Sequence, residues 1–158
     1  MTLVLGCPDA SSEKPILSLL RQAVQIAETD GRSTSDGAEG PLIVDLRTLA
    51  EGANHATGVA LGRDETRRSF GANVRNLSEA EAVRCDSIRC WVIDNGVFVK
   101  LDSLQAAADG AFTVFVTSVT TDRRPSGTSA ACTRQLSLRF ELREGKWVAT
   151  DNFLMLRC

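Results

Sequence analysis

The chain has 158 residues, of which 43% are hydrophobic and 24% are charged, and its formal net charge at pH 7 is −2. This length and composition are typical of one globular domain with a sizeable apolar core. A nearly neutral chain without a dense run of Lys or Arg lacks the basic surface on which nucleic-acid binding depends, so we expect no nucleic acid among its partners.

Residues 1–14 are predicted to be a tether ahead of a single domain that spans residues 15–158. The four residues that end at Cys7, Val-Leu-Gly-Cys, resemble the end of a bacterial lipoprotein signal, in which the cysteine after a small residue is lipidated. Only a short apolar segment precedes Cys7, as a truncated signal would leave. This interpretation places the protein in the bacterial periplasm or cell envelope, touching the membrane only through its lipid. The alternative is an ordinary N-terminus with a chance cysteine.

The first expected element is an amphipathic helix from Pro15 to Thr29. Apolar residues recur there at three- and four-residue spacing, which gives a helix one buried face. Proline is tolerated in the first turn because its missing N–H would have no acceptor within the helix. Asp30 and Gly31 are expected to end this helix, and residues 41–46, rich in aliphatic side chains, are predicted to form a strand.

Two shorter helices are expected next. The first covers residues 64–74 and has Phe70 and Val74 on one face. The second begins at Ser78 and ends near Cys85, because a serine followed three residues later by a glutamate is the pattern of a capping box.

A hairpin is predicted between residues 88–93 and residues 97–101. The apolar runs flank Asp94, Asn95 and Gly96, and Asn-Gly between two such runs is a strong hairpin signal because both residues tolerate positive φ.

The last two strands, residues 135–143 and 146–156, are predicted to form a hairpin about Glu144 and Gly145. Apolar and polar residues alternate along residues 135–143, so we expect one face of this sheet to be buried and the other to meet water. A strand over residues 112–121 extends the same meander. Helices that precede a run of strands indicate an α+β fold, with the N-terminal helices packed on one face of a curved antiparallel β-meander.

Residues 140–148, Phe-Glu-Leu-Arg-Glu-Gly-Lys-Trp-Val, are similar to the closing hairpin of NTF2-like (cystatin-like) α+β domains. The resemblance covers the last third of the chain. It implies a pocket between helices and sheet, which enzymes of this superfamily use for isomerase, cyclase or hydrolase chemistry. NTF2-like isomerases typically pair an Asp base with a Tyr-containing oxyanion site. This chain contains no tyrosine, which puts isomerase activity in doubt.

Four of the five cysteines are predicted to form two disulfides. Cys85 and Cys90 flank a short loop that can bring them close enough for a bridge. Reduced core cysteines, or a metal or redox pair, are the alternatives, although no second paired motif supplies further metal ligands. Counting outward from the last turn places Cys132 opposite Leu156, Arg157 or Cys158 in the final hairpin, so a bridge between Cys132 and Cys158 is the second predicted disulfide. This cysteine content favours an oxidising compartment, and the cytoplasm is the alternative location.

No residue is assigned a catalytic role, but three are candidates. His55 is the only histidine and has no nucleophile or ligand pattern around it. Asp45 lies in a short apolar strand, and Asp151 lies among apolar residues of the last strand. In one hairpin register Asp151 shares a face with Leu138 as a pocket carboxylate; in the other it faces outward opposite Arg139 as an ion pair.

These patterns favour an exported or lipid-anchored binding protein, without a catalytic motif, whose partner is an unknown small molecule or protein. The alternatives are an NTF2-like enzyme that uses Asp45, His55 or Asp151 in a pocket, and a periplasmic inhibitor or immunity protein that acts through an exposed face. The sequence implies no cofactor and no metal, and a homodimer is compatible with all three functions.

Overall fold

The computed structural model describes residues 15–34, 38–47, 63–71, 73–123 and 129–158. They form an α+β fold with one long N-terminal helix and a mostly antiparallel sheet. The elements in chain order are α1 (Pro15–Thr34), β1 (Leu42–Val44), α3 (Arg63–Phe70), β2 (Arg75–Asn76), α4 (Glu79–Ala82), β3 (Val83–Cys85), β4 (Cys90–Val92), the 3-10 turn η1 (Ile93–Asn95), β5 (Val97–Ala106), β6 (Phe112–Arg123), β7 (Ser129–Arg143) and β8 (Lys146–Arg157).

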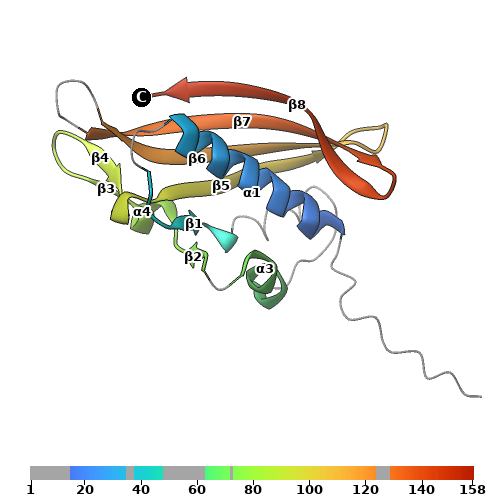
Figure 1. The fold of residues 1–158 in the computed structure, drawn as a ribbon, viewed down its shortest axis with the longest axis horizontal. Helices are drawn as coiled ribbons and strands as arrows, with labels where there is room; N and C mark the ends of the chain where they lie inside the picture. Colours follow the sequence, from blue (N-terminus) through green and yellow to red (C-terminus); the bar gives the residue numbers. More distant parts are fainter. Residues whose placement is uncertain (1–14, 35–37, 48–62, 72, 124–128) are drawn as a thin grey trace, which may run out of the picture.

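Six strands form one sheet in the order β2-β1-β5-β6-β7-β8 (Figure 1). Strands β5 to β8 are the antiparallel meander that the alternating sequence predicts. Strand β1 pairs in parallel with both β5 and β2, so the sheet as a whole is mixed. Strands β3 and β4 form a separate antiparallel hairpin.

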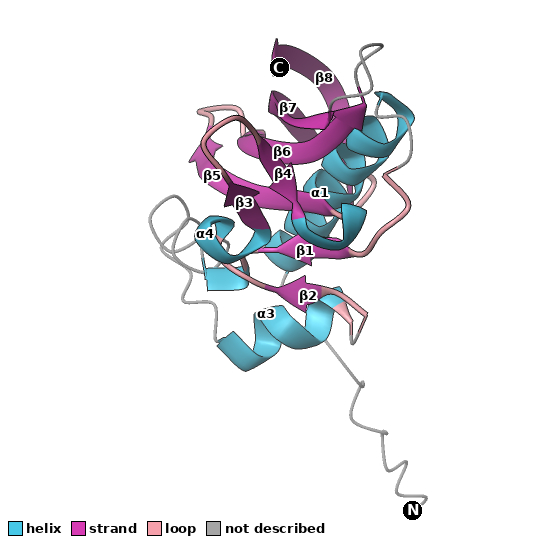
Figure 2. Cartoon of the chain, turned by 90° about the vertical axis from the view of Figure 1, so that its left-hand side faces the viewer, coloured by secondary structure: helices cyan, strands magenta, loops and turns pink. Residues whose placement is uncertain are grey.

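The main core lies between α1 and the sheet (Figure 2). The apolar stripe of α1 packs against inward-facing residues of β5, β6 and β7. Along β7 the predicted alternation of burial holds as far as Phe140, with Leu136 and Leu138 also buried, whereas Leu142 is 57% exposed. On the opposite side of the sheet, α4, β3 and β4 cover a second, smaller cluster, centred on Phe98 and Val119. At the start of β5 and the end of β6, the sheet is therefore buried on both faces. The sequence predicted one buried face and one face in water.

Helix α1 continues to Thr34, so the predicted stop at Asp30 and Gly31 is wrong. A Cβ atom on Gly31 would lie 3.2 Å from Cγ2 of Thr120 and 3.3 Å from Cγ1 of Val97. Gly31 thus marks a close approach of the helix to the sheet, and does not mark the end of the helix.

The predicted hairpin about Asp94, Asn95 and Gly96 is also wrong. Strand β4 pairs with β3, whereas β5 pairs with β1 and β6. Asp94 and Asn95 do adopt positive φ, at 52° and 53°, but Gly96 is extended with φ of −82°. The turn connects the small hairpin to the large sheet, so the local signal for a turn is right and the pairing inferred from it is not.

Helices α3 and α4, in contrast, are shorter than predicted. Helix α3 ends at Phe70, just before Gly71 with φ of 82°, and residues 75–76 form β2. The capping box of α4 is confirmed: the Glu81 N–H donates to Ser78 Oγ at 3.3 Å, and the Ser78 N–H donates to Glu81 Oε2 at 2.8 Å. Helix α4 nevertheless ends at Ala82, which leaves Cys85 in a strand.

Replacing Gly40 by alanine is expected to destabilise the fold by about 2 kcal/mol or more, because the added methyl group would overlap backbone atoms. Its Cβ would clash with the carbonyl oxygen of Asp94 and lie 2.6 Å from the carbonyl carbon of Asn95. Gly31→Ala is the matched control, since the three nearest atoms to its methyl group belong to side chains and not to the backbone, and alanine gains helix propensity. Thermal unfolding of both variants tests this; equal melting temperatures would contradict it.

Candidate functional site

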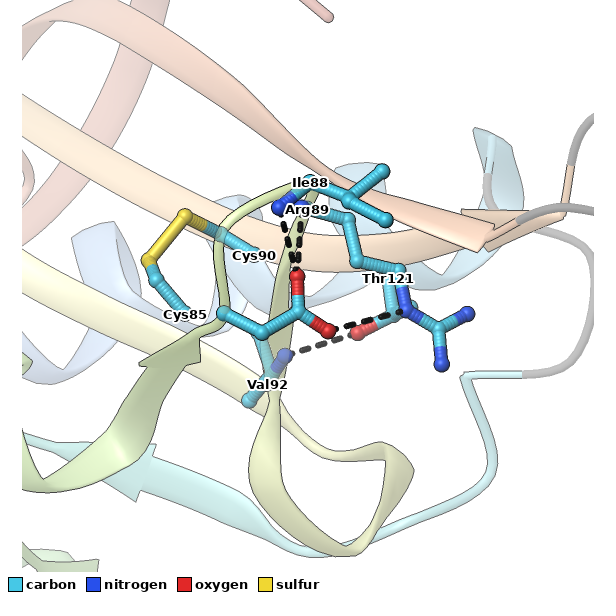
Figure 3. Close-up of a disulfide and its surroundings, with 7 residues drawn as sticks. Cys85, Ile88, Arg89, Cys90, Val92 and Thr121 are labelled. Atoms are coloured by element: carbon cyan, nitrogen blue, oxygen red, sulfur yellow. Dashed lines mark hydrogen bonds and ion pairs between the residues drawn. A yellow bond between two sulfur atoms is a disulfide. The ribbon is translucent and has the colours of Figure 1, made fainter.

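The β3–β4 hairpin carries the most exposed of the large apolar side chains that the structure describes, Ile88, at 90% exposure. Cys85 and Cys90 lie directly opposite each other in the ladder, with Cα atoms 4.0 Å apart, and form the predicted disulfide (Figure 3). The bridge closes the loop of residues 86–89 at its base. Ile88 therefore stands on a loop whose two ends are covalently joined.

Hydrogen bonds to one carboxylate shape this loop. Oδ1 of Asp86 accepts the backbone N–H groups of Ile88 and Arg89, each at 2.8 Å, and the Asp86 N–H donates to the Arg89 carbonyl at 2.9 Å. The two backbone donors lower the pKa of Asp86 below its ordinary value. Their contribution to stability is present above the ordinary pKa and is lost only as the pH falls through the lowered one. The loop is thus held in place throughout the neutral range.

Side-chain contacts fix the hairpin to the large sheet. Nη1 of Arg89 donates to Oγ of Ser129 at 3.3 Å, and the guanidinium lies 5.7 Å from the ring centroid of Trp91, within the range of a cation–π contact. The Val92 N–H donates to Oγ1 of Thr121 in β6 at 2.8 Å (Figure 3). Anchors to β6 and to the start of β7 give the loop a defined position on the domain.

A hollow of about 350 Å³ lies beside the hairpin. It offers a half-buried indole together with groups that donate or accept hydrogen bonds. Its lining residues are Arg89, Trp91, Val92, Asp94, Asn95, Thr121 and Ser129. Such a surface can receive a polar side chain or a small polar molecule.

The structure places Asp45 and Asp151 in different settings. Asp45 is buried, and its Oδ1 accepts the Arg47 N–H at 3.1 Å and pairs with Nε of Arg47 at 3.3 Å. Asp151 is exposed and lies opposite Arg139 in the β7–β8 ladder, so the outward-facing register is right. The predicted partner of Arg139 was Asp151; in the structure Arg139 forms ion pairs with Asp109 and Glu141.

The catalytic candidates do not converge among the described residues. Strands β5, β6 and β7 separate β1, which precedes Asp45, from β8, which carries Asp151. At about 4.8 Å per strand spacing, β1 and β8 are about 19 Å apart across the sheet. His55 and Cys7 lie outside the described residues, so the predictions for them stay predictions.

The second predicted disulfide joins Cys132 to Cys158. The β7–β8 ladder ends with Thr133 opposite Arg157, which makes the two cysteines the next facing pair. The carboxylate of Asp122 lies within 4.8 Å of both sulfur atoms. Cysteine binds a metal as a thiolate, and these two sulfurs are bonded to each other, so this group does not form a metal site in its oxidised state.

Sequence reasoning did not single out Ile88, Arg89 or Trp91. The available signal was Asp86 directly after Cys85, since an aspartate at that place favours a turn closed by its own side chain. What the sequence could not supply was the exposure of Ile88, which depends on how the hairpin sits against β6.

Two disulfides indicate an oxidising, non-cytoplasmic compartment. Among the residues that the structure describes, no helix has both the length and the apolar character needed to cross a bilayer. Comparison of the chain with protein-family models, curated proteins and solved structures found no match.

Proposed function

We propose that this chain is an exported binding protein that recognises a protein partner through the tip of the β3–β4 hairpin. The observation that carries the proposal is the 90% exposure of Ile88 on a loop closed by a disulfide and by the Asp86 carboxylate. A large apolar side chain in water gains free energy when a partner covers it. A loop that is already ordered loses little conformational entropy on binding, so that gain is kept as affinity.

The hollow next to the hairpin supports a protein partner over a small molecule alone. Protein interfaces combine an apolar anchor with a polar rim that fixes orientation. Here Ile88 is the anchor, and Arg89, Trp91 and Asp94 supply the aromatic and hydrogen-bonding groups beside it. A partner that covers Ile88 and extends a polar side chain into the hollow would use both features.

We also propose that Cys7 carries a lipid that holds the domain at the bacterial envelope, and that the architecture is NTF2-like, with α1 over a curved meander. A periplasmic inhibitor or immunity protein is one form that such a binding function would take. An enzyme that uses Asp45 and Asp151 together is disfavoured by their separation across the sheet.

A photo-crosslinking amino acid at position 88 should capture one partner in the cells that produce the protein. The same probe at Leu142, which is 57% exposed on the last hairpin, is the matched control and should not capture it. Ile88→Ser in the purified protein should then weaken binding of that partner by about thirtyfold, as removal of an interface anchor does.

The loop is tested with two substitutions at one position. Asp86→Asn keeps an oxygen that accepts the Ile88 and Arg89 N–H groups, whereas Asp86→Ala removes it. Binding should therefore survive the first and weaken in the second. Identical crosslinks from positions 88 and 142, or an affinity that ignores Ile88, would rule out the proposed contact.

A further inference from the structure

The two edges of the large sheet differ greatly. One edge is β2, with two residues, and the other is β8, with twelve. In Figure 1, β8 runs along the top of the molecule with no strand beyond it. A long edge strand presents a row of backbone N–H and C=O groups that can pair with another strand. Proteins usually interrupt such edges with charges, proline or bulges.

Residues 153–156 of β8 form an apolar run without any of these interruptions. Phe153 is 64% exposed, Leu154 44%, Met155 43% and Leu156 54%. The bulge in the β7–β8 ladder lies earlier, next to Thr150, and the pairing from Asp151 to Arg157 is regular. The most apolar part of the edge is thus also its straightest part.

The exposed side chains occupy both faces of the strand. Leu154 lies opposite the buried Leu136, on the side of the sheet that α1 covers, whereas Phe153 lies opposite Ser137 on the other side. Phe153 and Met155 also line a hollow of about 400 Å³ on that other side, which extends to Phe115. A ligand on one face would leave half of this surface in water, whereas an added strand would cover both.

We propose that the occupant is a second copy of this chain, paired antiparallel β8 to β8 about a two-fold axis. In the register that places Leu154 opposite the partner's Leu154, Phe153 faces the partner's Met155, and Asp151 faces the partner's Arg157. Symmetry repeats each contact, so the apolar centre is flanked by two opposite-charge pairs. Asp151 and Arg157 are both exposed in the single chain, and they lie at the two ends of the apolar run.

Neighbouring registers lack this match. A shift of two residues in one direction places Asp151 against the partner's Met155, and a shift in the other direction places Phe153 against the partner's Arg157. Each sets a charged group against an apolar one and leaves its former partner unpaired, which is unfavourable. The order of charged and apolar residues along β8 therefore selects one self-complementary pairing.

Sedimentation velocity of the full chain tests this pairing. Protein concentrations from about 1 µM to about 500 µM cover the dissociation constants of weak to moderate dimers. The unsubstituted protein should dimerise in this range. Asp151→Arg and Arg157→Asp should each raise the dimer dissociation constant about tenfold, because each creates two like-charge pairs. The double variant Asp151→Arg/Arg157→Asp restores opposite charges and should dimerise like the unsubstituted protein.

Leu154→Lys should abolish the dimer, since it sets two ammonium groups face to face, and Leu142→Lys, exposed but away from the edge, should leave it intact. Circular dichroism confirms that each variant is folded. A protein that stays monomeric throughout this range, or a dimer that ignores the single charge reversals, would overturn the proposal. A double variant as weak as the single variants would overturn the register and with it the assignment.

Discussion

Replacing Cys132 and Cys158 by alanine is expected to lower the free energy of unfolding by about 3.5 kcal/mol. The disulfide closes a loop with a sequence separation of 26, and in the chain-entropy model that closure removes disordered conformations mainly from the unfolded state. Alanine is preferred to serine because Cys132 is fully buried, and a hydroxyl there would lack water. Urea unfolding followed by tryptophan fluorescence measures the loss.

The other disulfide provides the matched comparison. Cys85 and Cys90 are only five positions apart, so removing their bridge should cost less, about 2 kcal/mol on the same model. The two disulfides also differ in role, because removing the Cys85–Cys90 bridge should weaken partner binding while the domain is still folded. Equal losses of stability would contradict the account based on loop length.

Arg134→Met is expected to destabilise the protein by about 3 kcal/mol, because it removes one member of a buried charged group. Arg134 is 1% exposed between α1 and the sheet, and its Nη1 donates to Oγ1 of Thr120 at 2.8 Å. Its Nε and Nη2 lie 3.7 Å from carboxylate oxygens of Asp30 and Asp122, respectively. Methionine fills the space but leaves two carboxylates without this counter-charge.

Arg139→Met on the same strand is the control. Arg139 is on the opposite face, and its side chain is 34% exposed, so water screens its pairs with Asp109 and Glu141. Such pairs contribute less than about 1 kcal/mol. Chemical denaturation of both variants compares the two sites; a loss at Arg139 as large as that at Arg134 would mean that burial does not control the cost.

The meander could be predicted from the sequence because its signals are local. Alternation along β7 depends only on neighbouring residues, and counting from the turn at Glu144 and Gly145 placed Cys132 near Cys158. Counting left the register open by one or two residues; the bulge at Thr150 fixes it, and no sequence pattern predicts that bulge. The same bulge is what faces Asp151 outward.

The parallel strands could not be predicted in this way. Strand β1 has three residues and pairs with Val97 to Val99, far along the chain, so no short-range pattern links them. Gly31 and Gly96 show the same limitation: each is glycine because of a close approach by a distant segment, which a local reading takes for a helix stop or a hairpin. For the candidate site, the bridge between Cys85 and Cys90 was predictable, but the position of Ile88 was not.

The packing of α1 against strands that come much later sets an order on folding. During synthesis the helix is complete long before β5, β6 and β7 exist, and its apolar stripe is not fully covered until the chain has grown to about Phe140. Contacts between segments so distant in sequence form slowly and leave intermediates prone to aggregation. Export before folding would suit such a chain, since the helix and its sheet would then meet only after all of the strands had been delivered.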